Sequence, residues 1–138
     1  MRSQPWVFGC RYNQIPDRYN SDILADIENR DVLTYLQQII PDITGIKQSV
    51  VMSMTSGCFI NEHTDANRGK AAYVYQLTKD WHPMYGGVLH FVDNGIAITP
   101  TFNMMSIMKT GDTGMIHCVT PVSDYVLGTR LTVAGILY

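Results

Sequence analysis

Three side chains of types that bind metals lie at two places in the chain. His63 and Asp65 form a His-Thr-Asp triplet, and His117 follows His63 by 54 residues. Two imidazoles and one carboxylate are the protein ligands of the facial site that holds Fe(II) and leaves coordination positions open. Arg130, 13 residues after His117, could bind the far carboxylate of a metal-chelating molecule through two hydrogen bonds. The spacing therefore predicts a ferrous site with a guanidinium group nearby.

Strands are the elements that would position these residues. His63 and Asp65 are two residues apart, so on an extended segment their side chains leave the same face. His117 lies in an apolar stretch, 115–119, which predicts a separate strand that brings the third ligand from elsewhere in the fold. Taken singly, each residue has an ordinary structural explanation: a surface hydrogen bond, a core histidine or a salt bridge. Their joint order and strand context favour the metal site.

The rest of the sequence predicts a helical region followed by many short strands. Apolar residues at helical spacing between 23 and 40 predict a helix that starts near Ser21 and ends before Pro41. A short strand is expected at 6–8. After residue 45, eight short segments with strand composition alternate with turn signals. They are 48–55, 58–63, 71–77, 88–92, 96–99, 103–108, 115–119 and 129–138.

This pattern predicts a mainly β fold in a single domain of 138 residues. Residues 46–138 would form a jelly-roll core of two sheets. Residues 1–45 would form a buttress of one strand and a short N-terminal helical region packed on that core. The Asp93-Asn94-Gly95 stretch is a strong signal for a tight connection between two strands.

Composition and charge exclude several classes of protein. The net charge of −2 and scattered basic residues give no electrostatic footprint for nucleic acid or for an anionic membrane surface. No apolar run approaches the length of a membrane helix. Three cysteines without CxxC spacing cannot all pair, which argues against a disulfide framework. A cytoplasmic location is expected, because a reducing compartment also suits a ferrous site.

The chain resembles the 2-oxoglutarate/Fe(II) dioxygenases, specifically their prolyl-hydroxylase-like branch. Matching stretches follow the family's order between residues 48 and 138. They are 57–65, 75–81, 86–91, 98–103, 117–122 and 128–133. The resemblance implies a double-stranded β-helix (jelly-roll) core and catalysis at Fe(II) held by His63, Asp65 and His117. It also implies 2-oxoglutarate as cosubstrate and O2 as oxidant.

The resemblance assigns further residues to the cosubstrate pocket. Arg130 would bind the distal carboxylate of 2-oxoglutarate, and Thr132, two residues further on the same strand face, would add a hydroxyl group. Leu89 and Val119 would be apolar walls, which is compatible with ordinary core packing. The oxygen-sensing prolyl hydroxylases of animals have a tyrosine where this chain has Gln76, so Gln76, or else Tyr73 or Tyr75, would have to replace that phenol.

These assignments imply a hydroxylase. Asp65 is retained, whereas related halogenases replace this carboxylate by a small residue. Nucleic-acid dealkylases of the superfamily carry a second arginine six residues after the first, and here that position is Ile136. The branch favours a prolyl residue in a peptide or protein as substrate, with a free amino acid or small metabolite as the alternative. Arg68, soon after the triplet, could bind an anionic substrate group or be a solvated loop residue.

Two alternatives to this assignment stay open. One is a cupin-like metal protein that does not use 2-oxoglutarate, and the other is a jelly roll that binds metal or peptide without turnover. The sequence does not predict an oligomeric state. Few residues precede the metal triplet or follow Arg130, so the resemblance implies a minimal or truncated form of larger relatives.

Overall fold

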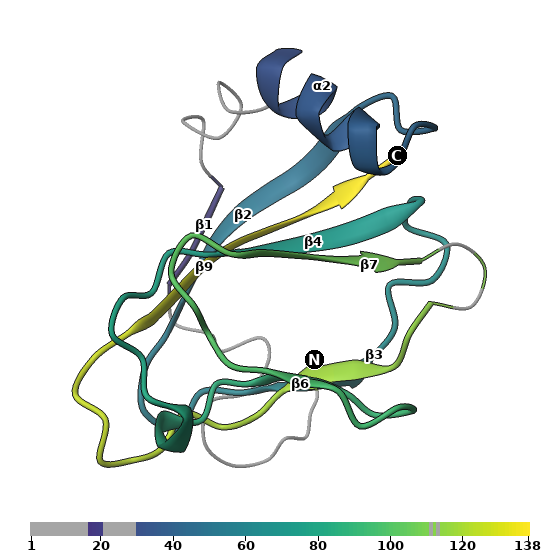
Figure 1. Ribbon diagram of the computed structural model, residues 1–138. Coiled ribbons are helices and arrows are strands. Elements are labelled where there is room, and N and C mark those ends of the chain that lie inside the picture. Colours follow the sequence, from purple (N-terminus) through teal and green to yellow (C-terminus); the bar gives the residue numbers. More distant parts are fainter. Residues whose placement is uncertain (1–16, 21–29, 111, 113) are drawn as a thin grey trace.

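Two antiparallel β-sheets face each other in the computed structural model, which describes residues 17–20, 30–110, 112 and 114–138 (Figure 1). The larger sheet has the strand order β1-β2-β9-β4-β7 and the smaller one β3-β8-β5-β6. The strands of the larger sheet are β1 (Asp17–Asn20), β2 (Ile46–Met54), β9 (Arg130–Leu137), β4 (Ala71–Gln76) and β7 (Met105–Lys109). Those of the smaller sheet are β3 (Ile60–His63), β8 (His117–Val119), β5 (Leu89–Phe91) and β6 (Ala97–Ile98).

The two faces of the larger sheet have different neighbours because side chains alternate along each strand. On β4, Ala72 belongs to the core between the two sheets, together with Leu89 and Val119 of the smaller sheet. The adjacent Tyr73 belongs to a second core on the outer face, which also contains Leu36 of helix α2 (Arg30–Ile39). The inner face of the larger sheet is therefore the one that can contribute side chains to a site between the sheets.

Helix α2 covers the outer face of the larger sheet, as Figure 1 shows. Leu33, Leu36 and Ile40 follow one another at helical spacing and pack into the outer core, and Leu36 is only 1% exposed. The helix ends before Pro41, which has no N–H to continue the hydrogen-bonded ladder. No α-helix within the described residues is long and apolar enough to cross a membrane.

The mainly β prediction is confirmed, with differences at the ends of elements. The described helix begins at Arg30, and the part of the predicted helical region at 21–29 and the predicted strand at 6–8 lie outside the described residues. Asp17–Asn20, where the sequence predicted no strand, forms β1 through antiparallel pairing with β2. That strand depends on a partner distant in sequence, so local composition did not reveal it. The predicted connection at 93–95 does join β5 to β6, which pair antiparallel.

Candidate metal centre

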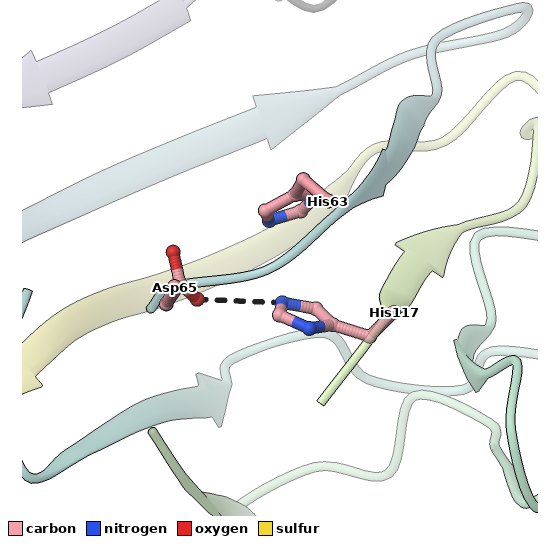
Figure 2. Close-up of side chains that lie close together, drawn as sticks. All are labelled: His63, Asp65 and His117. Atoms are coloured by element: carbon pink, nitrogen blue, oxygen red, sulfur yellow. Dashed lines mark ion pairs between the residues drawn. The ribbon is translucent and has the colours of Figure 1, made fainter. Parts of the chain in front are cut away.

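His63, Asp65 and His117 converge at one end of the smaller sheet. His63 is the last residue of β3, and His117, its partner in the antiparallel register, is the first residue of β8. Asp65 follows β3 by two residues, and Figure 2 shows all three side chains facing a common point. One potential ligand atom from each residue lies within 4.8 Å of the other two. The pairing of β3 with β8 thus assembles the three metal-binding side chains that the sequence predicted.

Backbone carbonyl groups fix which nitrogen each histidine offers to a metal. The Nδ1 atom of His63 lies 2.7 Å from the carbonyl oxygen of Asn61, and Nδ1 of His117 lies 2.7 Å from that of Met115. A carbonyl oxygen can only accept, so Nδ1 donates in both rings and Nε2 keeps its lone pair in the neutral form. Such contacts to the second ring nitrogen orient histidine ligands in metal sites.

The protonation states of the three side chains are coupled. The hydrogen bond with His117 is the main cause that lowers the pKa of Asp65 to about 2, against the opposing effect of burial. For His117, burial acts to lower the pKa. The contacts of its ring with the Asp65 carboxylate and the Met115 carbonyl act in the opposite direction and raise the pKa overall. Burial lowers the pKa of His63. Asp65 is therefore an anion at neutral pH, as a metal ligand must be.

The two carboxylate oxygens of Asp65 have different partners. Oδ2 lies 3.4 Å from Nε2 of His117, whereas Oδ1 accepts a hydrogen bond from Nη1 of Arg68 at 2.7 Å. A turn brings Arg68 back over Asp65, with the Arg68 N–H donating to the Asp65 carbonyl and Asn67 at a φ of 61°. The side chain of Asp65 is 8% exposed and that of Arg68 is 42% exposed. The ion pair therefore lies at the boundary between the interior and solvent.

A cavity of about 420 Å³ between the sheets connects the three residues with Arg130. Leu89 and Val119 of the smaller sheet border it, as do Met52 and Ile136 of the larger sheet. Leu89 and Val119 are buried and also belong to the core between the sheets. A molecule in this cavity could contact the three metal-binding side chains at one place and a guanidinium group at another.

Arg130 is a buried cation that the described residues do not neutralise. Its side chain is among the most deeply buried in the protein, at 1% exposure. Its Nε donates to the carbonyl oxygen of Gly87 at 2.7 Å, and its Nη1 lies 3.5 Å from Sδ of Met54. No carboxylate of the described chain lies within ion-pair distance of it. Burial lowers the pKa of Arg130 to about 10, so the group is still charged at neutral pH and requires an anionic partner.

Gly87 permits this placement of the arginine. Its φ is +64°, and a Cβ at this position would lie 2.7 Å from Cδ of Arg130. Only glycine combines that backbone conformation with so close an approach by the arginine stem. Gly87 thus leaves room for the arginine side chain, and its carbonyl oxygen accepts the hydrogen bond from Nε of Arg130.

Two further buried polar atoms beside Arg130 have no hydrogen-bond partner. Gln76 and Thr132 are opposite each other in the register of β4 and β9, and both are almost completely buried. Oε1 of Gln76 and Oγ1 of Thr132 are unsatisfied among the described residues. Thr132 follows Arg130 by two residues and so shares its face of β9. Neither residue borders the cavity itself, whereas Arg130 does.

These features fit a divalent metal and a small molecule with a carboxylate group. Two imidazole nitrogens and one carboxylate oxygen match the donor set of a facial Fe(II) site. A buried guanidinium group with the unsatisfied hydroxyl group of Thr132 on the same strand face matches the distal carboxylate end of a chelator. Iron is favoured by the types of donor atom, two imidazole nitrogens and one carboxylate oxygen, and not only by the closeness of the three side chains.

Comparison with known proteins agrees with this geometry. Residues 49–138 match the family model described as the 2OG-Fe(II) oxygenase superfamily. The chain belongs to the 2OG-Fe(II) oxygenase superfamily. Membership implies Fe(II), 2-oxoglutarate and O2, and His63, Asp65 and His117 form a possible iron site. No curated protein sequence matched the chain.

Two solved structures of prolyl hydroxylases resemble this oxygenase in fold. A prolyl-4-hydroxylase from Pseudomonas putida superposes with a TM-score of 0.65 at 18% identity, over 87% of this chain and 68% of the other. A prolyl hydroxylase from Trichoplax adhaerens, in complex with a peptide fragment of the oxygen degradation domain of hypoxia inducible factor, gives a TM-score of 0.57 at 20% identity. That match covers 78% of this chain and 56% of the other, so this oxygenase spans just over half of the second relative. The predicted membership of the superfamily is confirmed by the family model, and the fold is similar to that of prolyl hydroxylases.

Sequence reasoning missed several contacts of the site. Met54 was not assigned to the site from the sequence, yet its sulfur lies 3.5 Å from Nη1 of Arg130. The closeness of Gly87 to Arg130 likewise had no signal in the sequence. Arg68 was expected to bind an anionic substrate group or to be a solvated loop residue; it borders the cavity and forms an ion pair with Asp65. The short spacing from Asp65 to Arg68 is the signal that could have predicted this ion pair.

Proposed function

We propose that this oxygenase uses Fe(II) and 2-oxoglutarate to hydroxylate a C–H bond, and that its substrate is a prolyl residue in a peptide or protein. We also propose that the two facing sheets form a double-stranded β-helix (jelly-roll) core. The observation that carries it is the cavity that joins three convergent metal-binding side chains to a buried, unneutralised Arg130. A protein that only bound metal would gain nothing from a buried cation that lacks a partner.

Each residue of the site has a proposed role. His63, Asp65 and His117 would hold the metal through Nε2 of both rings and a carboxylate oxygen. Arg130 would bind the distal carboxylate of 2-oxoglutarate, and Leu89 and Val119 would enclose its carbon chain. When bound, Fe(II) and 2-oxoglutarate supply the oxidising chemistry. The protein contributes orientation, charge and exclusion of water.

Gln76 and Thr132 would complete the end of the pocket that faces the distal carboxylate. Thr132 can donate its hydroxyl hydrogen, and the amide group of Gln76 can donate through nitrogen. The unsatisfied Oγ1 of Thr132 supports this role, because a buried hydroxyl group normally has a hydrogen-bond partner. Oε1 of Gln76 can only accept a hydrogen bond, so Gln76 would contact the carboxylate through its amide nitrogen. Gln76 would then take the place of the phenol of animal prolyl hydroxylases.

Support for a prolyl substrate comes from the two similar structures, which are both of prolyl hydroxylases, one with a bound peptide. A second hollow of about 350 Å³ adjoins the metal site and shares His63, Asp65 and Arg68 with the main cavity. An extended peptide could approach the metal through this hollow. Arg68 would then be positioned to contact an anionic group of the substrate, as the sequence suggested.

The proposal is tested by measuring succinate after anaerobic loading with Fe(II) and 2-oxoglutarate and admission of air. We expect proline-containing peptides to stimulate succinate release and to gain one oxygen atom, with both signals lost in a His63→Ala variant. Stimulation by free amino acids alone would favour the small-metabolite alternative. No succinate with any substrate, from protein that still binds Fe(II), would contradict the use of 2-oxoglutarate and favour a cupin-like protein.

A further inference from the structure

The ion pair between Asp65 and Arg68 divides the two oxygens of the metal-binding carboxylate. Oδ2 is directed towards Nε2 of His117, which is the nitrogen left for a metal once Nδ1 donates to the Met115 carbonyl. Oδ1 is directed towards Nη1 of Arg68, at 2.7 Å. Figure 2 shows one Asp65 oxygen facing His117 and the other facing away from it. One oxygen is therefore presented to the metal position and the other to the guanidinium group.

We propose that Arg68 is a positioning residue that restricts Asp65 to coordination through a single oxygen. This inference rests on the proposed function, because it concerns the same metal site. A carboxylate can bind a cation through one oxygen or through both. If both bound, Asp65 would occupy two positions, and the site would lose one of the open positions on which chelation of a cosubstrate and binding of O2 depend.

The local backbone supports this role. Arg68 is brought to Asp65 by a turn in which the Arg68 N–H donates to the Asp65 carbonyl and Asn67 has a φ of 61°. Gly114 lies close to the backbone of this segment, where an added Cβ would be 3.1 Å from Cβ of Thr64 and 3.4 Å from the Asp65 nitrogen. The backbone at Asp65 is thus confined by its own turn and by a neighbouring loop, and its carboxylate is held by the guanidinium group.

The ordinary alternative is a salt bridge that stabilises the turn and has no effect on the metal. Ion pairs with an exposed partner typically contribute about 0–1 kcal/mol to stability. The two roles differ in what they predict for the metal. A stabilising pair changes the unfolding transition, whereas a positioning residue changes the number of coordination positions open to water.

The test counts the water ligands of bound Mn(II) by pulsed EPR in ¹⁷O-enriched water, without cosubstrate. We expect about three water ligands in the parent protein, as a facial site with three protein ligands leaves open. Arg68→Met should lower that number, because the released oxygen of Asp65 can then bind the metal as well. Arg68→Lys, which keeps a cation, should restore it. Lys109→Met, a charge-removing change at an exposed position of β7, is the matched control and should leave the count unchanged.

Equal water counts in Arg68→Met and the parent protein would overturn the positioning role. The result can be separated from the proposed function. If the counts change as expected but no substrate yields succinate, the proposed function fails and the role of Arg68 stands. If the parent protein does not bind Mn(II) at all, both fail.

Discussion

Replacing Arg130 by methionine should have opposite effects on cosubstrate binding and on stability. Arg130 is 1% exposed, and its guanidinium group donates to the Gly87 carbonyl oxygen and, more weakly, to Sδ of Met54. Burial lowers its pKa from the usual range of a guanidinium group to about 10, which corresponds to roughly 3 kcal/mol of desolvation cost at neutral pH. Because the folded-state pKa is the lower one, that cost is present at neutral pH and is relieved only as the pH rises above about 10.

The stability of the ligand-free Arg130→Met variant should therefore be close to that of the parent protein. Loss of the hydrogen bond to Gly87 costs about 1.5–3 kcal/mol, since it involves a charged donor. Removal of the buried charge also removes its desolvation cost, which stabilises the folded state by a similar amount of free energy. We expect the free energy of unfolding, measured by urea denaturation in the presence of a chelator, to change by no more than about 2 kcal/mol in either direction.

Cosubstrate affinity should fall far more in the same variant. Truncation of one partner of a buried, hydrogen-bonded charge pair costs about 2–5 kcal/mol, or roughly 30-fold to several thousand-fold in dissociation constant. Anaerobic calorimetric titration of the Mn(II)-loaded protein with 2-oxoglutarate measures this change. Arg130→Lys, which keeps the charge but not the paired donors, should lie between the parent and Arg130→Met. A folded Arg130→Met variant that binds 2-oxoglutarate as tightly as the parent would refute the reasoning.

Three further predictions follow from the same geometry. Gly87→Ala should weaken 2-oxoglutarate binding and cost about 1–3 kcal/mol of stability, because the new Cβ meets Arg130 and the backbone is left-handed; unchanged affinity and stability would contradict this. Thr132→Val should leave ligand-free stability unchanged or higher, since it removes an unsatisfied buried hydroxyl, while it weakens 2-oxoglutarate binding in the same titration. In metal-free protein, the depressed pKa of Asp65 supplies about 2 kcal/mol that is present above pH 4 and lost towards pH 2. Asp65→Asn should remove that acid-dependent part of the urea-unfolding profile, and an unaltered profile would show that other groups cause it.

The metal site was predictable from sequence because part of it is local and part is encoded by strand pattern. His63 and Asp65 lie on one extended segment, so their spacing alone places both side chains together. His117 could be recognised as a strand residue, but its pairing opposite His63 is a tertiary fact. The family resemblance, and not periodicity, supplied the expectation that these distant strands meet.

Features that depend on turns and on tertiary contacts were not predictable. The ion pair of Arg68 with Asp65 needs a turn with Asn67 in a left-handed conformation. The short spacing of the two residues suggests that they could pair, but it does not specify this turn. Strand β1 exists because β2 offers an edge to pair with, not because of its own composition. Short strands such as β6 and β8 also begin and end where their partners do, so propensity placed their centres but not their boundaries.

The most direct test of the metal site is a crystal structure of the protein loaded anaerobically with Fe(II) and 2-oxoglutarate, with anomalous data collected at the iron absorption edge. The account predicts one anomalous peak, within bonding distance of Nε2 of His63, Nε2 of His117 and a single oxygen of Asp65. The distal carboxylate of 2-oxoglutarate should contact the guanidinium group of Arg130. An iron peak away from these three side chains, or a 2-oxoglutarate molecule that does not reach Arg130, would contradict it.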